Sequence, residues 1–277
     1  MDGGKPVRLA IFGLGEAGSL LGADLAAAGA AVSGYDPAAV ATPPGVRRQR
    51  DPEAAVKGAD AVLGITAAVD AETALNQALG AIPAGAVYAD LSTAPASLEA
   101  RLGALAAGRG LDFADVALMA PVPGRGITTP ALASGPGAGR LAVILVPLGM
   151  PVTDIGGDPG LASSRKLLRS VMMKGLAAVV IEAMQGASQA RCEEWLWANL
   201  VDEITTADKD FLARLVRGTA PHAHRRLHEM EASAELLEEL GVDPLMTRST
   251  VESLRRALDT PLPHLPDLPD LPDSAAS

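Results

Sequence analysis

Short apolar runs alternate with alanine-rich stretches through the first half of the chain. The runs stay apolar at almost every position, which is typical of strands buried on both faces of a parallel sheet. We predict strands at Val7–Phe12, Ala31–Tyr35, Ala61–Ile65, Ala86–Leu91 and Phe113–Ala117. Helical stretches separate them, the first at Ser19–Ala28. This alternation indicates an α/β domain over residues 1–158, with a parallel sheet and helices on both faces.

After Gly160 the spacing of apolar residues becomes helical. We predict helices at Leu161–Ala190, Glu193–Thr206, Asp208–Leu215, Ala223–Leu240 and Thr247–Leu258. Residues 159–260 are therefore expected to form an all-helical domain. Residues 261–277 repeat Leu-Pro-Asp three times, and proline at every third position favours an extended or disordered tail. This tail is either a floppy end or a ligand for a partner protein.

Composition narrows the class of protein. With 48% apolar residues in 277, the chain can bury a globular core, and its net charge of −10 argues against nucleic-acid or membrane partners. Cys192 is the single cysteine, so no intramolecular disulfide can form. The first residues lack a signal-peptide pattern, and the apolar run Leu141–Met150 is too short to span a bilayer. We therefore expect a cytoplasmic protein.

A glycine motif stands between the first predicted strand and the first helix. Gly13-Leu14-Gly15-Glu16-Ala17-Gly18 has the pattern G-x-G-x-x-G of a dinucleotide-binding turn. Gly13 permits the tight turn, Gly15 lets the backbone approach a pyrophosphate, and Gly18 lets the helix pack closely on the strand. The helix N-terminus then attracts the anion. These six residues are candidate cofactor contacts in a Rossmann domain.

The second predicted strand ends in an acid at the position expected for nucleotide recognition. Asp36 follows Gly15 by 21 residues, where a carboxylate accepts hydrogen bonds from the adenosine ribose. The same charge repels a 2′-phosphate, which favours NAD, but the nearby Arg47 and Arg48 leave NADP open. Thr66, after the third predicted strand, is a further candidate cofactor contact.

Three later segments follow in a recognisable order. Asp90-Leu91-Ser92-Thr93-Ala94-Pro95 ends the fourth predicted strand, Ala120–Gly126 forms a glycine-containing loop, and Gly157–Lys166 leads into the long helix. In this order the chain resembles the β-hydroxyacid dehydrogenase family, the relatives of 6-phosphogluconate dehydrogenase. The resemblance implies an NAD(P)-dependent oxidoreductase that transfers hydride reversibly at a secondary alcohol or carbonyl of a small anionic substrate.

The resemblance also implies roles for residues of the long helix. Lys166 matches the family's general acid–base, which exchanges the hydroxyl proton as hydride moves. Ser170 stands where the family generally has asparagine, one helical turn later, and Lys174 is a candidate second cation. For Lys166 the alternative is a solvated helix lysine, since Arg165 and Arg169 are its neighbours. We take Lys166, Ser170 and Lys174 as the catalytic candidates.

Two other segments carry implied ligand contacts. Ser92 and Thr93 are expected beside the nicotinamide and the substrate, although hydroxyl residues here also suit a helix N-cap for a helix at Leu98–Leu105. In the loop, Pro123 replaces the family's carboxylate-binding serine. Gly124 and Arg125 follow, and Arg125 is either a bidentate anion clamp or an ordinary loop arginine.

A histidine-rich segment lies in the helical half. His222 and Arg226 are candidate substrate contacts, or part of a charged helix face. His224 and His228 have an i, i+4 spacing that suits zinc, but the adjacent Arg225 disfavours a cation, and we predict no metal. The resemblance, together with the small size of the helical domain, implies a homodimer through that domain.

Two other functions remain open. One is an imine or ketone reductase on the same scaffold that uses NADPH; imine reductases of this superfamily usually replace the lysine, so Lys166 argues against it. The other is a dinucleotide-binding protein without turnover, because the substrate loop is altered and the asparagine is missing.

Overall fold

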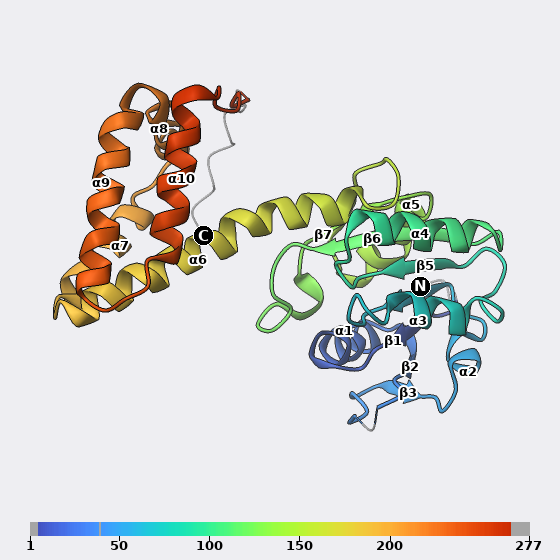
Figure 1. The fold of residues 1–277 in the computed structure, drawn as a ribbon. Helices are drawn as coiled ribbons and strands as arrows, with labels where there is room; N and C mark the ends of the chain where they lie inside the picture. The colour runs from blue at the N-terminus through green and yellow to red at the C-terminus, as the bar shows by residue number, and fades with distance from the viewer. Residues whose placement is uncertain (1–4, 39, 267–277) are drawn as a thin grey trace. The chain divides into compact units, whose positions relative to one another are not determined.

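The protein is described by a computed structural model that covers residues 5–38 and 40–266. Eight strands of the described chain form one sheet (Figure 1). They are β1 Arg8–Phe12, β2 Ala31–Tyr35, β3 Val46–Arg48, β4 Ala61–Gly64, β5 Val87–Asp90, β6 Asp112–Leu118, β7 Ala131–Ser134 and β8 Val152–Asp154. The helices that pack on the sheet are α1 Glu16–Ala27, α2 Pro52–Val56, α3 Ala71–Ala78, α4 Ala96–Ala107 and α5 Ala138–Leu145. The 3-10 turns are η1 Gly126–Thr128 and η2 Val146–Leu148.

The strand order is β3-β2-β1-β4-β5-β6-β7-β8. Its first six strands are parallel and have the order of a Rossmann domain, which confirms the predicted fold class. From β1 the sheet extends through β2 to β3 on one side, and from β4 it extends through β5 and β6 on the other. The direction in which strands are added therefore reverses between β1 and β4. Ligands of such sheets bind in the crevice at the carboxyl ends of the strands at this point.

Three strands were not predicted. β3 and β8 have three residues each, too few for an alternating pattern to show, and β7 is a short run within a segment rich in glycine and proline. β7 also pairs antiparallel with β6, so the sheet is mostly rather than wholly parallel. The five predicted strands are present, with ends that differ by one residue or less from the expected ones.

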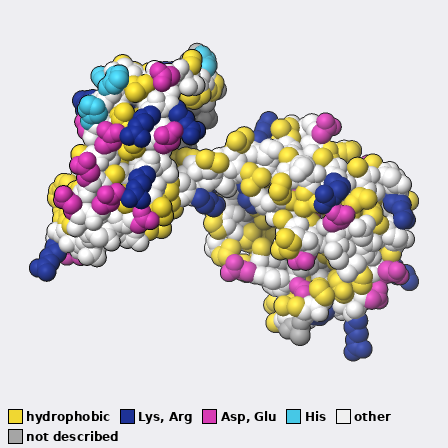
Figure 2. Space-filling view, in the orientation of Figure 1, with side chains coloured by type: hydrophobic (Ala, Val, Ile, Leu, Met, Phe, Trp, Pro, Cys, Tyr) yellow, Lys and Arg dark blue, Asp and Glu magenta, His cyan; other side chains and the backbone are white. Residues whose placement is uncertain are grey.

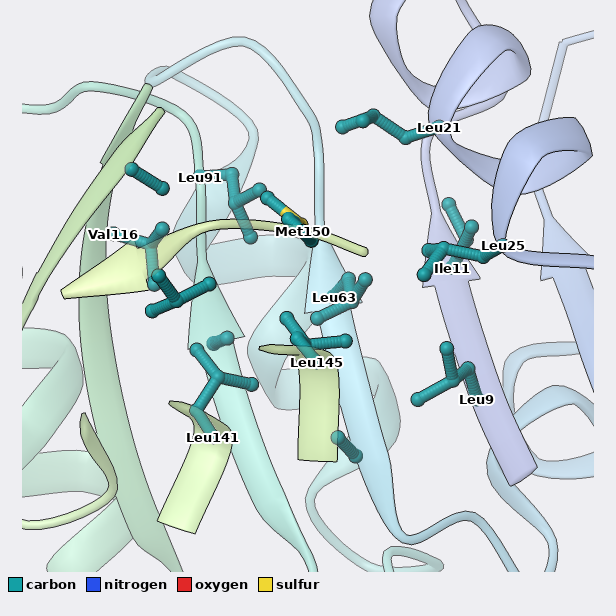
Figure 3. Close-up of a cluster of buried hydrophobic side chains, with 14 of the residues drawn as sticks. Leu9, Ile11, Leu21, Leu25, Leu63, Leu91, Val116, Leu141, Leu145 and Met150 are labelled. Carbon is teal, nitrogen blue, oxygen red and sulfur yellow. The ribbon is translucent and has the colours of Figure 1, made fainter. Parts of the chain in front are cut away.

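Side chains alternate between two cores, one on each face of the sheet. Leu9 and Ile11 of β1 pack with Leu21 and Leu25 of α1 (Figure 3). The helix α5 covers the same face further along the sheet, through Leu141 and Leu145. The intervening strand residues face the opposite way, toward α2, α3 and α4. Burial on both faces explains why the strands are apolar throughout.

The rest of the described chain is helical. The helices are α6 Leu161–Gln189, α7 Glu193–Thr205, α8 Lys209–Arg217, α9 Thr219–Glu239 and α10 Leu245–Asp259. The chain divides into two compact units, 1–171 and 172–277, so the division falls inside α6. In the second unit α9 packs along α10, through Leu227, Val251 and Leu254 (Figure 1). Residues 261–266 have no regular structure, and the prediction for 267–277 lies outside the described residues.

Membrane insertion has no support from the described helices. Over residues 5–38 and 40–266, every helix is too short or too polar to cross a bilayer.

Candidate active site

The glycine loop after β1 has a geometry that tolerates side chains poorly. Gly13 has φ +91°, and a Cβ there would lie 2.2 Å from the carbonyl oxygen of Ile65. A Cβ on Gly18 would lie 1.9 Å from the carbonyl oxygen of Gly13. Gly15 differs, because a Cβ there would meet nothing within 4 Å. The first and third glycines therefore let the chain turn and pack, and the middle one borders open space.

The open space at Gly15 lies where α1 begins. Gly15 is the N-cap residue and provides no side chain to satisfy the first-turn N–H groups. Those N–H groups and the helix dipole suit an anion. The amide of Leu14 is already used, since it donates to Asp36 Oδ2 at 2.7 Å, and its side chain is buried. This arrangement fits the pyrophosphate of a dinucleotide.

A cavity of about 400 Å³ lies beside this loop, between the carboxyl ends of β1, β2 and β4 and the helix α3. Of the predicted cofactor residues, Gly13, Gly15, Asp36 and Thr66 line it. The sequence did not point to its remaining walls, which are Phe12, Tyr35, Pro37, Ala38, Ile65, Ala67, Asp70, Thr73, Ala74 and Gln77. Most of these lie in the turns after β2 and β4 or on one side of α3, and only the fold brings those segments together.

The charged side chains that line this cavity are negative. Asp36 and Asp70 both line it, and no lysine or arginine is among the described lining residues. The guanidinium of Arg48 donates to the backbone carbonyls of Asp36, Ala38 and Val40. Arg48 therefore holds the turn after β2, a use that its sequence position did not reveal.

The segment after β5 carries a strained residue. Thr93 has φ +58°, which is unusual for a β-branched side chain. Lys166 Nζ donates to Thr93 Oγ1 at 2.6 Å. β4 and β5 are neighbouring parallel strands with Gly64 opposite Asp90. The segment after β5 therefore begins beside the segment after β4, which carries Thr66. Strain of this kind tends to occur at functional sites, and here it coincides with the contact between two predicted site residues.

Ser92 is held by the first residue of its own motif. Its backbone N–H and its hydroxyl both donate to Asp90 Oδ1, at 2.9 and 2.5 Å. Ser92 makes no side-chain hydrogen bond to the first turn of α4, whose N-cap residue is Pro95. The two hydroxyls of the motif are thus oriented by different partners, Ser92 by Asp90 and Thr93 by Lys166.

The first turn of α6, which carries Lys166, is anchored by Asp115 of β6. Asp115 Oδ2 accepts from the N–H groups of Gly160 and Ser163, at 2.9 and 3.1 Å, and from Ser134 Oγ at 3.0 Å. Its Oδ1 accepts from Ser163 Oγ at 2.5 Å. The carboxylate is fully buried, so a distant strand caps this helix.

Buried acids lie behind the D-x-S-T segment. Asp90 and Glu99 are fully buried, on β5 and α4. Burial and, to a smaller extent, the charges of Asp90 and Asp115 together raise the pKa of Glu99 to about 9. Burial also raises the pKa of Asp90, partly opposed by hydrogen bonds from Ser92. The sequence pointed to Asp90 as part of its motif but did not single out Asp115, although an acid within an apolar strand is a signal that could have marked it.

The predicted substrate loop is pinned to α1. The N–H of Ile127 donates to Asp24 Oδ2 at 2.8 Å, and Arg125 and Gly126 donate through their backbone N–H groups to the carbonyl of Val122. Pro123, Gly124 and Arg125 are exposed. The contribution of these three residues to substrate binding stays a prediction.

The remaining candidates lie on α6 and α9. Ser170 is half-buried in the first unit, and Lys174 is exposed and belongs to the second unit. His222 is exposed, whereas Arg226 donates to Thr219 Oγ1 at 2.6 Å within α9. Arg226 also donates to the backbone carbonyl of Leu215 at 3.1 Å, which ties α9 to the end of α8. Their roles in catalysis and substrate binding stay predictions.

Comparison with known families agrees with this geometry. Residues 8–126 match the NAD binding domain of 6-phosphogluconate dehydrogenase, and residues 187–257 match a domain of unknown function, DUF1932. An uncharacterized 28.5 kDa protein of Methanothermus fervidus is 29% identical over 119 residues, 43% of this chain. The match spans about half (47%) of that curated relative.

Solved structures resemble the chain over most of its length. A conserved hypothetical protein from Sinorhizobium meliloti 1021 is 30% identical, with 91% of this chain and 88% of that one covered and a TM-score of 0.58. A reductive aminase from Aspergillus terreus, in complex with NADPH and ethyl levulinate, is 23% identical, with 92% and 94% covered and a TM-score of 0.77. A conserved protein described as structurally similar to 3-hydroxyacid dehydrogenases is 24% identical, with 91% and 97% covered and a TM-score of 0.58.

The fold and the glycine loop define an NAD(P)-binding Rossmann protein of the oxidoreductase type. The chain belongs to the 6-phosphogluconate dehydrogenase-like family, which confirms the resemblance seen in the sequence. Its first unit contains the NAD-binding domain.

Proposed function

We propose that the protein is an NAD-dependent oxidoreductase in which Lys166 exchanges a proton with the substrate oxygen during hydride transfer at a carbonyl or secondary alcohol. The observation that carries this proposal is the 2.6 Å contact between Lys166 Nζ and Thr93 Oγ1. This contact joins α6 to the segment after β5. That segment follows the carboxyl end of its strand, as the glycine loop does after β1. On this proposal, Lys166 is the proton donor beside the dinucleotide crevice.

The chemistry divides between cofactor and protein. A reduced nicotinamide, when bound, would supply a hydride to the carbonyl carbon. The ammonium of Lys166 gives its proton to the carbonyl oxygen, so that an alcohol leaves, and the reverse direction returns the proton to the amine. Thr93 holds Lys166 in place, and Asp115 fixes the first turn of α6, which precedes Lys166.

Electrostatics at the cavity favour NAD over NADP. A 2′-phosphate would meet the carboxylates of Asp36 and Asp70 in a cavity without a described lysine or arginine in its wall. Arg48 lies near Asp36, but its guanidinium already donates to three backbone carbonyls. The ribose hydroxyls of NAD, by contrast, are donors that a carboxylate accepts.

Imine reduction is the second candidate. It is favoured by the TM-scores of 0.75 to 0.78 to reductive aminases and imine reductases. Here hydride adds to an iminium carbon and the product is an amine, so Lys166 has no oxygen to protonate. The two candidates therefore differ in whether turnover needs Lys166.

Lys166→Ala, with Arg165→Ala on the same helix as a matched control, separates them. Turnover is followed by cofactor absorbance with hydroxy acids, ketones and cyclic imines. We expect Lys166→Ala to lower kcat/KM for carbonyls by about 10²- to 10⁴-fold, the usual range for a lost general acid, with the cofactor Kd changed less than threefold. Arg165→Ala should turn over normally, because its side chain is exposed.

Three other outcomes would contradict the proposal. Full carbonyl turnover by Lys166→Ala would remove the lysine from the chemistry. Turnover of imines alone, unaffected by the substitution, would establish the second candidate. Tight cofactor binding without turnover of any substrate would indicate a binding protein.

A further inference from the structure

Behind Ser92 lies a buried group of polar atoms whose hydrogen bonds are incomplete. Within the described part of the chain, four buried oxygens have no hydrogen-bond partner of good geometry: Asp90 Oδ2, both carboxyl oxygens of Glu99 and the hydroxyl of Tyr88. All three side chains are fully buried. A Cβ built on Gly64 would lie 2.7 Å from Tyr88 Oη and 3.4 Å from Asp90 Oδ2, so these oxygens surround Gly64.

Two buried carboxyl groups without a cation cannot both be ionised at low cost. The charged groups that act on Glu99 of α4 are Asp90 of β5 and Asp115 of β6, both negative. One carboxyl must therefore hold a proton at neutral pH. A proton on Glu99 also supplies the donor that Asp90 Oδ2 lacks, because a carboxylic acid donates one hydrogen bond.

The contacts decide which of the two carries the charge. Asp90 Oδ1 accepts two hydrogen bonds from Ser92, which stabilise its ionised form. Among the described residues, Glu99 has no hydrogen bond of good geometry, and only one contact, with the backbone N–H of Ala94, favours its ionised form. The arrangement with Asp90 charged and Glu99 neutral satisfies more of these buried atoms than the reverse arrangement.

A charged Asp90 has a direct consequence for Ser92. The hydroxyl proton of Ser92 points to Asp90 Oδ1 at 2.5 Å, so Ser92 Oγ offers only lone pairs to a ligand. Thr93 has the opposite polarity, because its Oγ1 accepts from Lys166 and keeps its own proton for donation. Two adjacent hydroxyls thus present one acceptor and one donor.

We propose that the Asp90–Glu99 pair makes Ser92 an obligatory hydrogen-bond acceptor, so that this position takes an N–H or O–H donor of the ligand rather than a carboxylate. The donor is the amide N–H of the nicotinamide carboxamide. This inference rests on the proposed placement of Ser92 beside the bound cofactor. It assigns a positioning role to Glu99, which the sequence did not single out and which acts on the ligand through Asp90 and Ser92.

The test compares binding of NAD with binding of its 3-acetylpyridine analogue, in which a methyl group replaces the carboxamide –NH₂. Calorimetry at pH 7 gives both dissociation constants without turnover. We expect wild-type protein to bind NAD about tenfold more tightly than the analogue, as for one good hydrogen bond. Ser92→Ala should bring the ratio close to one, and Asp90→Asn should lower it to about threefold or less.

Two further variants make the test specific. Glu99→Gln should keep the tenfold ratio, because an amide N–H replaces the acid O–H as donor to Asp90, whereas Glu99→Leu should lower it. Ser97→Ala, an exposed serine on α4, is the matched control and should behave as wild type. Melting temperatures establish that each variant is folded, and Glu99→Gln, nearly isosteric, keeps the test decisive if Asp90→Asn does not fold.

The failures are distinguishable. Absence of NAD binding by folded wild-type protein would contradict the proposed function itself. Binding of NAD with an analogue ratio near one in wild type, or an unchanged ratio in Ser92→Ala, would overturn the inference and leave the cofactor assignment intact.

Discussion

Asp36 shows how one side chain can serve both structure and selectivity. Its Oδ2 accepts from Leu14 N–H and its Oδ1 from Ala38 N–H, at 2.7 and 2.8 Å, so it joins the glycine loop to the turn after β2. Each carboxylate oxygen has capacity for a further hydrogen bond. The same group can therefore hold the loop and accept from a ribose.

Replacing this charge should change the cofactor preference. We expect Asp36→Asn to reduce the preference for NAD over NADP about tenfold, because the repulsion of a 2′-phosphate is lost while the side chain keeps its size. Dissociation constants for both cofactors provide the measurement. Asp112→Asn, an exposed acid at the start of β6, is the control. Tighter binding of NADP than of NAD by the wild type would contradict our assignment.

Glu99 should make stability depend on pH in an unusual direction. Its folded pKa of about 9 lies above the usual carboxyl value, owing to burial and then to the charges of Asp90 and Asp115. Between about pH 4.5 and 9 the folded state therefore binds more protons than the unfolded state, and stability falls as pH rises.

This dependence can be measured by thermal unfolding. At most one proton is involved, so the loss is at most about 1.4 kcal/mol per pH unit. We expect Glu99→Gln to flatten the fall in melting temperature between pH 5 and pH 9. Glu72→Gln, which only breaks an exposed ion pair with Arg101, should leave the slope unchanged. Equal slopes in wild type and Glu99→Gln would show that Glu99 ionises normally.

At the scale of elements, the position of Lys166 depends on how α6 begins. An N-terminal turn needs acceptors for its free N–H groups, and here a buried carboxylate of β6 supplies them. Ser134 of β7 also donates to that carboxylate and accepts from Ala162 N–H at 3.1 Å. The helix is thereby fastened to two strands of the sheet.

Removing this anchor should affect both stability and turnover. We expect Asp115→Asn to cost about 2–4 kcal/mol, since several buried donors lose an ionised acceptor, and to lower kcat with little change in the cofactor Kd. Ser134→Ala removes one donor and should cost about 1 kcal/mol. Far-UV circular dichroism should follow the unfolding, because both tryptophans lie on α7 in the other unit. An unchanged midpoint in Asp115→Asn would contradict the anchoring role.

At the scale of the whole molecule, the second unit has a small core for its size. Its described buried cluster is Leu227, Val251 and Leu254, with Met230 packed against it. No described residue of α7 is buried, and the face of this unit seen in Figure 2 mixes charges of both signs. On α7, Trp197, Val201 and Ile204 are exposed at helical spacing.

An uncovered apolar stripe of this kind predicts self-association, in agreement with the homodimer that the resemblance implies. We expect wild-type protein to be dimeric at micromolar concentration by light scattering. Trp197→Glu combined with Ile204→Glu should yield monomer, because a charge on the stripe would be buried without a partner. Val143→Glu, at an exposed apolar position of the first unit, should remain dimeric. A monomeric wild type would contradict this prediction.

The sequence by itself determined the features that depend on neighbouring residues. Hydrophobic period distinguishes strand from helix, and the G-x-G-x-x-G pattern at Gly13–Gly18 predicts the turn between them. Asp36 was predicted from a fixed spacing along one β-α-β unit. These signals are local, so the fold class, the family and the glycine loop could be read before any coordinates.

Only the tertiary structure decided which residues distant in the sequence are in contact. Lys166 meets Thr93 across 73 residues, and Asp115 meets Ser163 across 48. The strands β3, β7 and β8 form because longer neighbouring strands offer them hydrogen bonds. The sequence of such a short segment does not reveal this pairing. Likewise, the proton shared by Asp90 and Glu99 follows from burial without a cation, and burial is a property of packing rather than of the order of residues.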